Sequence, residues 1–314
     1  LYDRFLPLYT GEVKPEGFDL DFQVVDDPRE LFDRVGGSAE FDVAEFSGTE
    51  YITRHAINDS PFIALPVFAS RFFRHGFTFV NRNAGIKSPK DLEGRNVGVQ
   101  LYTMSAAMWI RGMLQDEYGV DLSKIHWVQG ALDKPGAHGT PSVLPLLQQP
   151  DLVNNESNKS LGQMLEDVEI DALMGAMTPA CFHINDDIVR LFPDYRQVEL
   201  DYYSRTKIFP LMHLVVMRKD VHEAHPGLAA SLYDAFGRAK DIAMQRMRFT
   251  GALRYMLPFL HDDLDELDAV FRGDHWPYGI ELNRPTLEAE VRYMVEQYYI
   301  EKPISIEELF AEVG

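Results

Sequence analysis

The stretch that decides the fold is GIKSPKDLEGRNVGVQLYTMSAAMWIRGMLQDEYGV, residues 85–120. A short helix is predicted to begin at Ser88, because a serine followed by proline and, three residues on, by an acidic residue is a common helix start. The apolar run 96–100 predicts a buried strand. A longer helix follows from about Thr103 and ends at Gly119. A strand that leads into a helix of this length is typical of an α/β fold.

The same alternation of apolar runs and helices extends over the rest of the chain. Further runs of strand length cover residues 41–46, 62–68, 76–80, 124–129, 170–176 and 213–219. Their hydrophobicity is continuous rather than alternating, which suits strands buried on both faces. We therefore predict largely parallel sheets. The segment 131–159 is rich in Pro, Gly and Asn and predicts a long loop, which is often functional.

Composition limits the classes of protein that fit. The 314 residues suffice for one large or two ordinary domains. A net charge of −19 argues against nucleic-acid binding, which needs a basic face, and it means that an anion site must be built locally. No apolar run approaches the length of a membrane span. The single cysteine, Cys181, excludes an intramolecular disulfide and a cysteine-based zinc site.

Beyond these patterns, the sequence resembles a known family. The stretch 85–120 is similar to the segment that enters the second lobe of type 2 periplasmic-binding-protein folds. Six segments look like the 4,5-dihydroxyphthalate decarboxylase family: VKPEGFDLDF (13–22), FDVAEFSGTEY (41–51), PFIALPVFASRFFRH (61–75), YTMSAAMWIRGMLQDEYGV (102–120), RLFPDYRQVELDYYSRTKIFPLMHLVVMRKDV (190–221) and HWPYGIELNRPTLEAEVRYMVEQ (275–297). The resemblance runs over nearly the whole chain and is weakest in 131–159.

The resemblance implies an α/β fold of two lobes that face a ligand cleft. By analogy, the strands 77–82 and 211–219 are hinges. Lobe one is then expected to comprise residues 1–82 and 211–314, with both termini, and lobe two residues 83–210.

The resemblance also implies an activity, the non-oxidative decarboxylation of an aromatic dicarboxylic acid. The expected reaction converts 4,5-dihydroxyphthalate to 3,4-dihydroxybenzoate (protocatechuate) and carbon dioxide, without an organic cofactor. The alternative is a solute-binding protein that delivers a small aromatic carboxylate to an ABC transporter. A third reading, a thiamine-precursor enzyme with a histidine- and cysteine-rich iron site, is disfavoured by the single cysteine.

The expected cellular location depends on which of these functions is correct. A decarboxylase is expected in the cytoplasm, and a binding protein in the periplasm or on a lipid anchor. Because the chain opens at Leu1 and not at Met, the lack of a signal peptide does not decide between them. The sequence leaves the oligomeric state open, and a homo-oligomer is compatible with it.

Decarboxylation requires an acid that protonates the ring carbon bearing the leaving carboxylate, and a base can take the proton of the phenol. Glu45 ends a strand beside Phe46, and partial burial could raise the pKa of its carboxyl enough for proton donation. His75 and His213 lie on or beside the hinge strands, and histidine titrates in the neutral range. Each has a structural alternative: Glu45 as an arginine partner, and the histidines as buried core residues.

The second carboxylate of the substrate requires cations or backbone N–H groups. Arg71 and Arg74 could supply them, and the alternative is a pair of ordinary surface arginines. Thr103 and Ser105 lie at a helix start, which binds anions or is simply capped by a hydroxyl.

Other candidates concern the aromatic ring and a metal. The remaining predicted substrate contacts are Tyr2, Arg4, Phe46, Tyr102 and Phe209, and the aromatic ones are core residues by default. A metal held by Glu45, His75 and His213 stays open, but no HxH or HxxxH spacing supports it.

Overall fold

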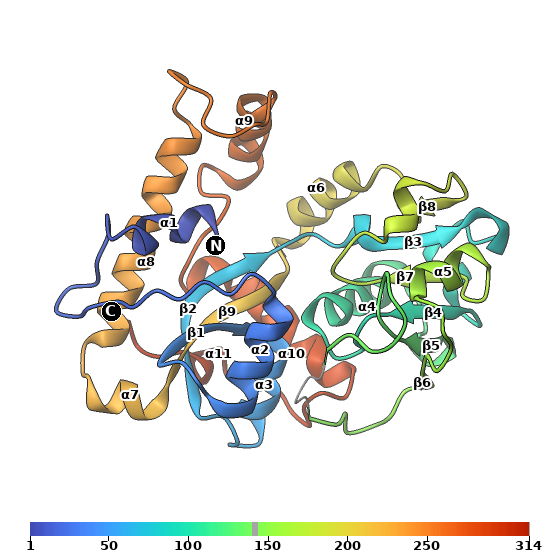
Figure 1. The fold of residues 1–314 in the computed structure, drawn as a ribbon, viewed down its shortest axis with the longest axis horizontal. Helices are drawn as coiled ribbons and strands as arrows, with labels where there is room; N and C mark the ends of the chain where they lie inside the picture. Colours follow the sequence, from blue (N-terminus) through green and yellow to red (C-terminus); the bar gives the residue numbers. More distant parts are fainter. Residues whose placement is uncertain (140–143, 314) are drawn as a thin grey trace.

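A computed structural model describes residues 1–139 and 144–313 and shows two lobes, each built on its own β-sheet (Figure 1). Lobe one has a three-stranded sheet in the order β1-β9-β2, with β1 Val43–Ser47, β2 Phe62–Arg71 and β9 Leu211–Arg218. Lobe two has a six-stranded sheet in the order β6-β5-β4-β7-β3-β8. Its strands are β3 Thr78–Asn81, β4 Asn96–Val99, β5 His126–Gln129, β6 Leu152–Asn154, β7 Ala172–Met174 and β8 Ile188–Arg190. The predicted α/β architecture of two lobes is confirmed.

The expectation of largely parallel sheets holds for lobe two alone. Strands β4 to β7 pair in parallel there, while β3 pairs antiparallel with both of its neighbours. In lobe one, β1 and β2 both run antiparallel to β9. The local sequence does not reveal this antiparallel pairing, because β9 reaches lobe one only after the chain has passed through all of lobe two.

Helices cover both sheets. Their bounds are α1 Leu6–Tyr9, α2 Pro28–Ser38, α3 Gly48–Ala56, α4 Ser105–Tyr118, α5 Leu161–Glu166, α6 Tyr195–Thr206, α7 Lys219–Ala224, α8 Leu228–Met247, α9 Leu260–Phe271, α10 Arg284–Glu296 and α11 Ile306–Leu309. Helix α4 ends at Gly119, which takes the left-handed conformation with a φ of 64°. Its N-cap is Met104, so Thr103 does not cap it.

The chain passes between the lobes in residues 72–77 and 207–210. The segment 77–82, expected as a hinge, is instead mostly β3 within the six-stranded sheet, because Thr78–Asn81 pairs with β7 and β8. The two passages lie side by side, since the Phe72 N–H donates to the Pro210 carbonyl over 3.2 Å. By sheet membership, lobe one therefore ends near residue 71.

The predicted long loop 131–159 runs from lobe two to lobe one. Residues 140–143 of this loop lie outside the described part, and β6 forms within its second half. The Leu147 N–H donates to the Tyr298 carbonyl behind α10 over 2.8 Å. Gly139 lies against the side chain of Arg29 in α2. The loop thus connects the two lobes at a third place.

Helix α4 packs tightly against α10 of lobe one. The Trp109 indole donates to the Leu211 carbonyl over 2.7 Å. Arg111 is fully buried and donates to Gln297 and to the Tyr299 hydroxyl, each over 2.8 Å. These bonds fix the start of α4 relative to the sheet of lobe one, which matters because the candidate site lies at that start.

We expect Gly112→Ala to destabilise the protein by about 1–3 kcal/mol, the usual cost of overpacking. A Cβ at Gly112 would lie 2.3 Å from the Tyr293 ring, which is buried against Trp109. Thermal unfolding measures the effect. The control is Gly237→Ala in α8, where nothing lies within 4 Å of the new Cβ and helix propensity favours alanine. Equal melting temperatures for Gly112→Ala and wild type would disprove the tight packing.

Candidate active site

A chain of three polar side chains lies at the sheet of lobe one. The Tyr2 hydroxyl donates to Glu45 Oε1 over 2.7 Å, and the same oxygen lies 2.6 Å from His213 Nδ1. Glu45 is on β1 and His213 on the neighbouring strand β9, so the sheet itself brings them together. The edge of the Phe32 ring, with centroids 4.7 Å apart, packs against the imidazole. The imidazole is thus held on two sides.

Glu45 is held as a carboxylate. Burial raises the pKa of Glu45, but the hydrogen bonds from His213 and Tyr2 and the nearby Arg4 outweigh it, so that the pKa lies below its ordinary value. The expected raised pKa was therefore wrong, because the sequence did not reveal these donors. The Glu45 carboxylate thus accepts hydrogen bonds from the Tyr2 hydroxyl and from the His213 imidazole. The His213 and Glu45 side chains are 19% and 15% exposed, so both are partly accessible to a ligand.

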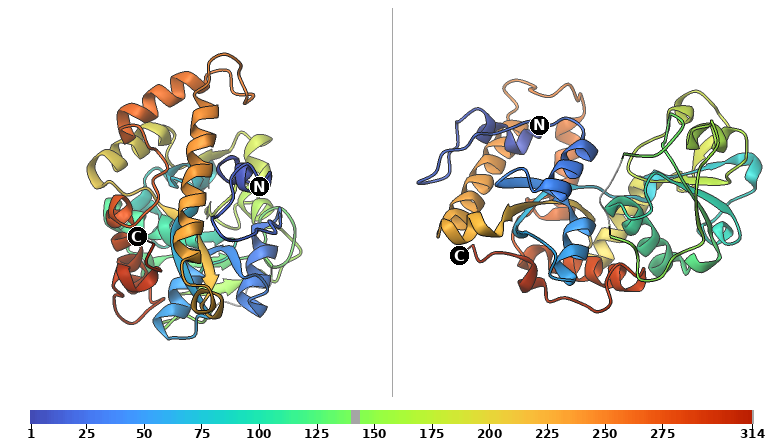
Figure 2. Two further views of the ribbon diagram at one scale, coloured as in Figure 1. Left: turned by 90° about the vertical axis from the view of Figure 1, so that its left-hand side faces the viewer. Right: turned by 60° about the horizontal axis from the view of Figure 1, so that its bottom comes forward.

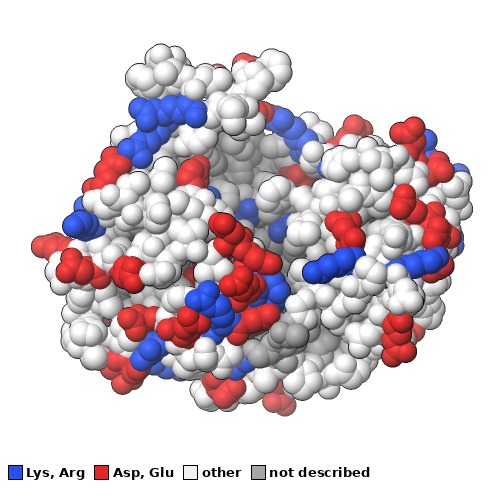
Figure 3. Space-filling view, viewed as in Figure 1, with Lys and Arg blue, Asp and Glu red and all other residues white. Residues whose placement is uncertain are grey.

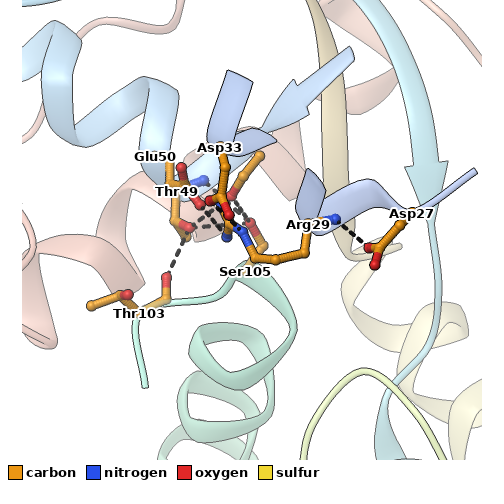
Figure 4. A network of polar contacts seen from close by, with 8 residues as sticks. Asp27, Arg29, Asp33, Thr49, Glu50, Thr103 and Ser105 are labelled. Carbon is orange, nitrogen blue, oxygen red and sulfur yellow. Dashed lines mark hydrogen bonds and ion pairs between the residues drawn. The ribbon is translucent and has the colours of Figure 1, made fainter. Parts of the chain in front are cut away.

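Hydroxyl groups connect this part of lobe one to the start of α4 in lobe two (Figure 4). The Ser105 Oγ lies 3.2 Å from both the Ser47 and Thr49 hydroxyls and accepts from the Thr49 N–H. The Thr49 hydroxyl donates to the Thr103 carbonyl over 3.0 Å. In the strand register, Ser47 is the direct partner of His213. The Ser105 hydroxyl therefore contacts Ser47, the residue that pairs with His213 across the sheet, and the Thr103 carbonyl is bonded to Thr49 beside it.

An ion-pair network supports the lobe-one side of this contact (Figure 4). Arg29 in α2 pairs with Glu50 at the start of α3 over 2.9 Å and with Asp33 over 2.8 Å. It fixes the helix that carries Phe32 relative to the helix start that carries Thr49. Sequence reasoning missed this network, although the polar cluster Ser-Gly-Thr-Glu directly after a strand, residues 47–50, was a usable signal.

Arg74 lies between the lobes as a buried cation. Its Nη1 donates to the Ala176 carbonyl beyond β7 over 3.1 Å, and its Nε lies 3.3 Å from the Met212 sulfur, one residue before His213. No carboxylate among the described residues lies within 4.0 Å of it. Burial lowers the pKa of Arg74 to about 10, against an opposing effect of Glu199. The guanidinium keeps its charge at neutral pH and has hydrogen-bonding capacity for an anion.

Gln100 was not predicted and belongs to the same region. It follows β4, and its Oε1 accepts from the Ala176 N–H over 3.2 Å. Its buried Nε2 has no hydrogen-bond partner within the described residues. Ala176 is thus bonded by Gln100 on one side and by Arg74 on the other.

Arg71, by contrast, is a structural residue at the base of lobe one. It donates to Asn283 over 2.6 Å and to the Phe209 carbonyl over 2.9 Å, and its guanidinium lies 4.4 Å from the Phe209 ring centroid. Phe209 in turn stacks on Phe73. Burial lowers the pKa of Arg71 to about 9. Neither Arg71 nor Phe209 joins the Glu45–His213 pair.

Three more predicted residues lie in the core. His75 is buried among aromatic rings with its Nδ1 3.8 Å from Glu199, and burial lowers its pKa to about 4. Tyr102 lies under the Arg111 guanidinium at 3.7 Å, in the core of lobe two. Phe46 is fully buried in β1. The structure therefore brings none of these three to the pair.

Arg4 does lie beside the pair. Its guanidinium stacks between the rings of Tyr2 at 4.1 Å and Trp276 at 4.3 Å, and its Nε donates to the Ala69 carbonyl over 3.1 Å. Of the predicted substrate contacts, Tyr2 and Arg4 thus accompany Glu45 and His213.

Two spaces are candidates for the ligand. Figure 3 shows the molecule hollowed between its two lobes. A separate cavity of about 290 Å³ lies within lobe one, between the extended segment 20–26 and β1, and Tyr2 and Glu45 form part of its wall. That cavity is mainly apolar and does not include His213, so the interlobe hollow is the better place for an anionic ligand.

A further carboxyl, Glu290 in α10, is buried behind this region. Its Oε1 has no hydrogen-bond partner in the described part of the chain and lies close to Gly48 at the start of α3. Burial raises the pKa of Glu290 to about 8, and Arg71 opposes this only in part. The carboxyl is therefore largely protonated at neutral pH.

We expect Glu290 to make stability fall as the pH rises. In the unfolded chain the carboxyl ionises near pH 4.3, whereas in the folded chain it keeps its proton until about pH 8. Between these two pH values the folded chain binds more protons than the unfolded chain, so the free energy of unfolding falls as the pH rises. Glu290→Gln should raise the free energy of unfolding relative to wild type by about 3–4 kcal/mol more at pH 8 than at pH 5.

Thermal and urea unfolding at both pH values measure this difference. Glu288→Gln, an exposed position of the same helix, is the control and should show no pH-dependent gain. The same difference at both pH values for Glu290→Gln would mean that the carboxyl is not protonated in the folded state.

The fold and the site together define the class of the protein. Two lobes joined by two passages, with a polar site between them, form the type 2 periplasmic-binding-protein fold. A periplasmic sulfonate-binding protein of Methylobacillus flagellatus matches it with a TM-score of 0.52 and 13% identity, over 90% of this chain and 76% of that one. The aliphatic sulphonate binding protein of Escherichia coli matches with a TM-score of 0.50 and 12% identity, over 90% and 84%. At such identities only the fold is shared.

Sequence comparison identifies the family. A 4,5-dihydroxyphthalate decarboxylase of Comamonas testosteroni is 38% identical over 283 residues, which cover 90% of this chain and 85% of that protein. One of Pseudomonas putida is 36% identical over 181 residues, 58% of this chain and 69% of that protein. The chain belongs to the 4,5-dihydroxyphthalate decarboxylase family, as the resemblance predicted. No protein-family model matches the chain.

Across residues 1–139 and 144–313, no three His, Cys, Asp or Glu side chains are grouped as a metal site requires. In the same ranges, no helix combines the length and the apolar character needed to cross a bilayer. The expectation of a reaction without a cofactor stays a prediction.

Proposed function

We propose that this chain is a carboxy-lyase that converts 4,5-dihydroxyphthalate to 3,4-dihydroxybenzoate and carbon dioxide in the space between its lobes. Membership of the decarboxylase family supports the reaction. The observation that carries the assignment to this site is the contact between Glu45 and His213, an imidazole held by a carboxylate 2.6 Å away and partly exposed. An imidazole held in this way suits general acid–base catalysis.

In the proposed reaction, the His213 imidazolium donates its proton to the ring carbon that bears the leaving carboxylate. The ring loses aromaticity, and a lone pair of the para hydroxyl oxygen stabilises the cationic intermediate while the hydroxyl keeps its proton. The carbon–carbon bond to the carboxylate then breaks, its electron pair restores the aromatic ring, and carbon dioxide leaves. Glu45 stabilises the imidazolium before the transfer and fixes which nitrogen faces the ring.

Arg74 is proposed to hold the carboxylate that stays on the ring. It is buried and charged, and its Nε lies 3.3 Å from the sulfur of Met212, the residue that precedes His213 on β9. A buried guanidinium binds a carboxylate strongly, because the pair exchanges little water. The hydroxyls of Ser47 and Ser105, which lie 3.2 Å apart, are proposed to contact the oxygen atoms at the other end of the ring.

A solute-binding protein with the same fold would need only a cation and a surface for the ring. The Glu45–His213 pair is the feature that such a protein would not require. The two functions also differ in outcome, because a binding protein releases its ligand unchanged.

The test is incubation of the purified chain with 4,5-dihydroxyphthalate while carbon dioxide and 3,4-dihydroxybenzoate are measured. We expect equimolar formation of both. Phthalate, which lacks the hydroxyls, is the control and should bind without conversion, since no para oxygen can stabilise the protonated ring. Tight binding of 4,5-dihydroxyphthalate without product would instead support the solute-binding function.

A further inference from the structure

Strand β2 ends where the chain leaves lobe one for lobe two (Figures 1 and 2). Ser70 lies at this end and is partly exposed between two buried neighbours. In the strand register it is the direct partner of His213, as Ser47 is on the other side of β9. Directly opposite residues of antiparallel strands share a face of the sheet. The Ser70 side chain therefore lies beside His213, on the face that contacts lobe two through Ser47 and Ser105.

A bulge in β2 brings Ser70 to this position. From Leu65 to Ser70, β2 advances five residues while β9 advances only two. The bulge begins with Pro66, which has no N–H for the ladder and is tolerated in such a place. In a regular ladder the residue opposite His213 would be Val67. The bulge thus places a hydroxyl, in place of an apolar side chain, beside the imidazole.

Donors from outside the sheet hold the bulge in place. Three carbonyls within the bulge each accept a hydrogen bond from such a donor. The bonds are Gly279 N–H to the Pro66 carbonyl over 2.9 Å, the Trp276 indole to the Phe68 carbonyl over 2.9 Å, and Arg4 Nε to the Ala69 carbonyl over 3.1 Å. Because buried carbonyls without a ladder partner need such donors, the bulge is a fixed part of the fold.

The Tyr2 hydroxyl connects Ser70 to the Glu45–His213 pair. It donates to Glu45 Oε1 over 2.7 Å. Burial raises the pKa of the Tyr2 phenol, and a hydrogen bond from Ser70 is among the effects that lower it, so Ser70 donates to the phenol oxygen. A serine hydroxyl has one proton and two lone pairs. In the described part of the chain no donor is bonded to the lone pairs of Ser70, so they can accept from a ligand hydroxyl.

We propose that Ser70 accepts a hydrogen bond from the substrate hydroxyl that lies para to the leaving carboxylate. This inference rests on the proposed decarboxylation and extends it. The Cβ atoms of opposite residues are about 4.5–5.5 Å apart, a distance that one hydroxylated benzene ring spans between His213 and Ser70. When His213 protonates the ring, the para hydroxyl oxygen shares the positive charge, and its O–H becomes a stronger donor. Ser70 then stabilises the transition state more than the bound substrate.

The first test is the turnover of 4,5-dihydroxyphthalate by Ser70→Ala. We expect kcat to fall about tenfold, as for the loss of one hydrogen bond of the transition state. Ser60→Ala is the matched control, because Ser60 precedes the other end of β2 and its hydroxyl bonds only to Phe62. It should keep the kcat of wild type. Both variants should show a cooperative unfolding transition. A kcat of Ser70→Ala equal to that of wild type would overturn the proposal.

The second test measures ligand selectivity by calorimetric titration in the His213→Asn variant, which should not consume its ligands. The ligands are 4-hydroxyphthalate, whose hydroxyl is para to one carboxylate, and 3-hydroxyphthalate, which has no hydroxyl para to a carboxylate. Adding Ser70→Ala should lower the affinity ratio of the first to the second at least about fivefold. An unchanged ratio would equally overturn the proposal. The ratio does not depend on turnover, so a wild type without product would contradict the decarboxylation while this ratio still decides the role of Ser70.

Discussion

Replacing His213 with Asn is expected to lower kcat for decarboxylation of 4,5-dihydroxyphthalate by at least about a hundredfold, the usual scale for loss of a general acid. The amide keeps a polar group at this position of β9 but cannot deliver a proton. Binding of the unchanged acid should alter only a few-fold, because Arg74 and the hydroxyls at the start of α4 remain. Stopped assays give kcat, and calorimetric titration gives the affinity.

The matched control for His213 is the surface residue His126. His126 also contacts a carboxylate, Asp151, but both side chains are more than half exposed in lobe two. His126→Asn should leave kcat unchanged. Near-normal turnover by His213→Asn would remove His213 from the reaction.

Glu45→Gln separates positioning from proton donation. It should also lower kcat, since the imidazolium loses the carboxylate that stabilises it. Binding of the unchanged acid should alter only a few-fold, so that the loss lies in kcat and not in Kd. A kcat equal to that of wild type would contradict the positioning role of Glu45.

Replacing Arg74 with Ala is expected to weaken binding of 4,5-dihydroxyphthalate by about 1.5–3 kcal/mol, the range for a charge-assisted hydrogen bond. This corresponds to roughly ten- to a hundredfold in Kd. Since both carboxylates of the substrate are equivalent by symmetry, the effect concerns whichever one stays on the ring. Arg74→Lys should recover part of the affinity, because it keeps the charge but not the planar guanidinium.

Arg71 is the matched control for Arg74. It lies three residues away and is equally buried, but its guanidinium is used by Asn283 and Phe209. Arg71→Lys should therefore lower the melting temperature with little change in Kd. An unchanged Kd in Arg74→Ala, with a cooperative unfolding transition, would exclude Arg74 from the site.

The fold could be predicted where local signals are strong. The strand and helix of 85–120 carry caps, a stop at Gly119 and a clear change of period, and they form as β4 and α4. The strands β6 and β8 were missed because three residues are too short to show any periodicity. The prediction that β3 belongs to lobe one was wrong, since its pairing partners are about a hundred positions away in the sequence.

The site could be predicted only in part, because its contacts also join residues that are far apart in the sequence. Glu45 and His213 were found from their places at strand ends, but they are 168 positions apart, and their contact was not visible in the sequence. The sign of the Glu45 pKa shift depended on that contact and was therefore wrong. Arg71 and Arg74 carried equal signals, and only the fold shows that one is enclosed by lobe one while the other lies between the lobes.

The crystal structure of His213→Asn with 4,5-dihydroxyphthalate tests the central claim most directly, because this variant should bind the acid without consuming it. We expect the ring between the lobes, with one carboxylate on Arg74 and the carbon of the other facing residue 213. The acid bound instead in the cavity of lobe one behind Glu45, or away from Arg74 and residue 213, would contradict the account.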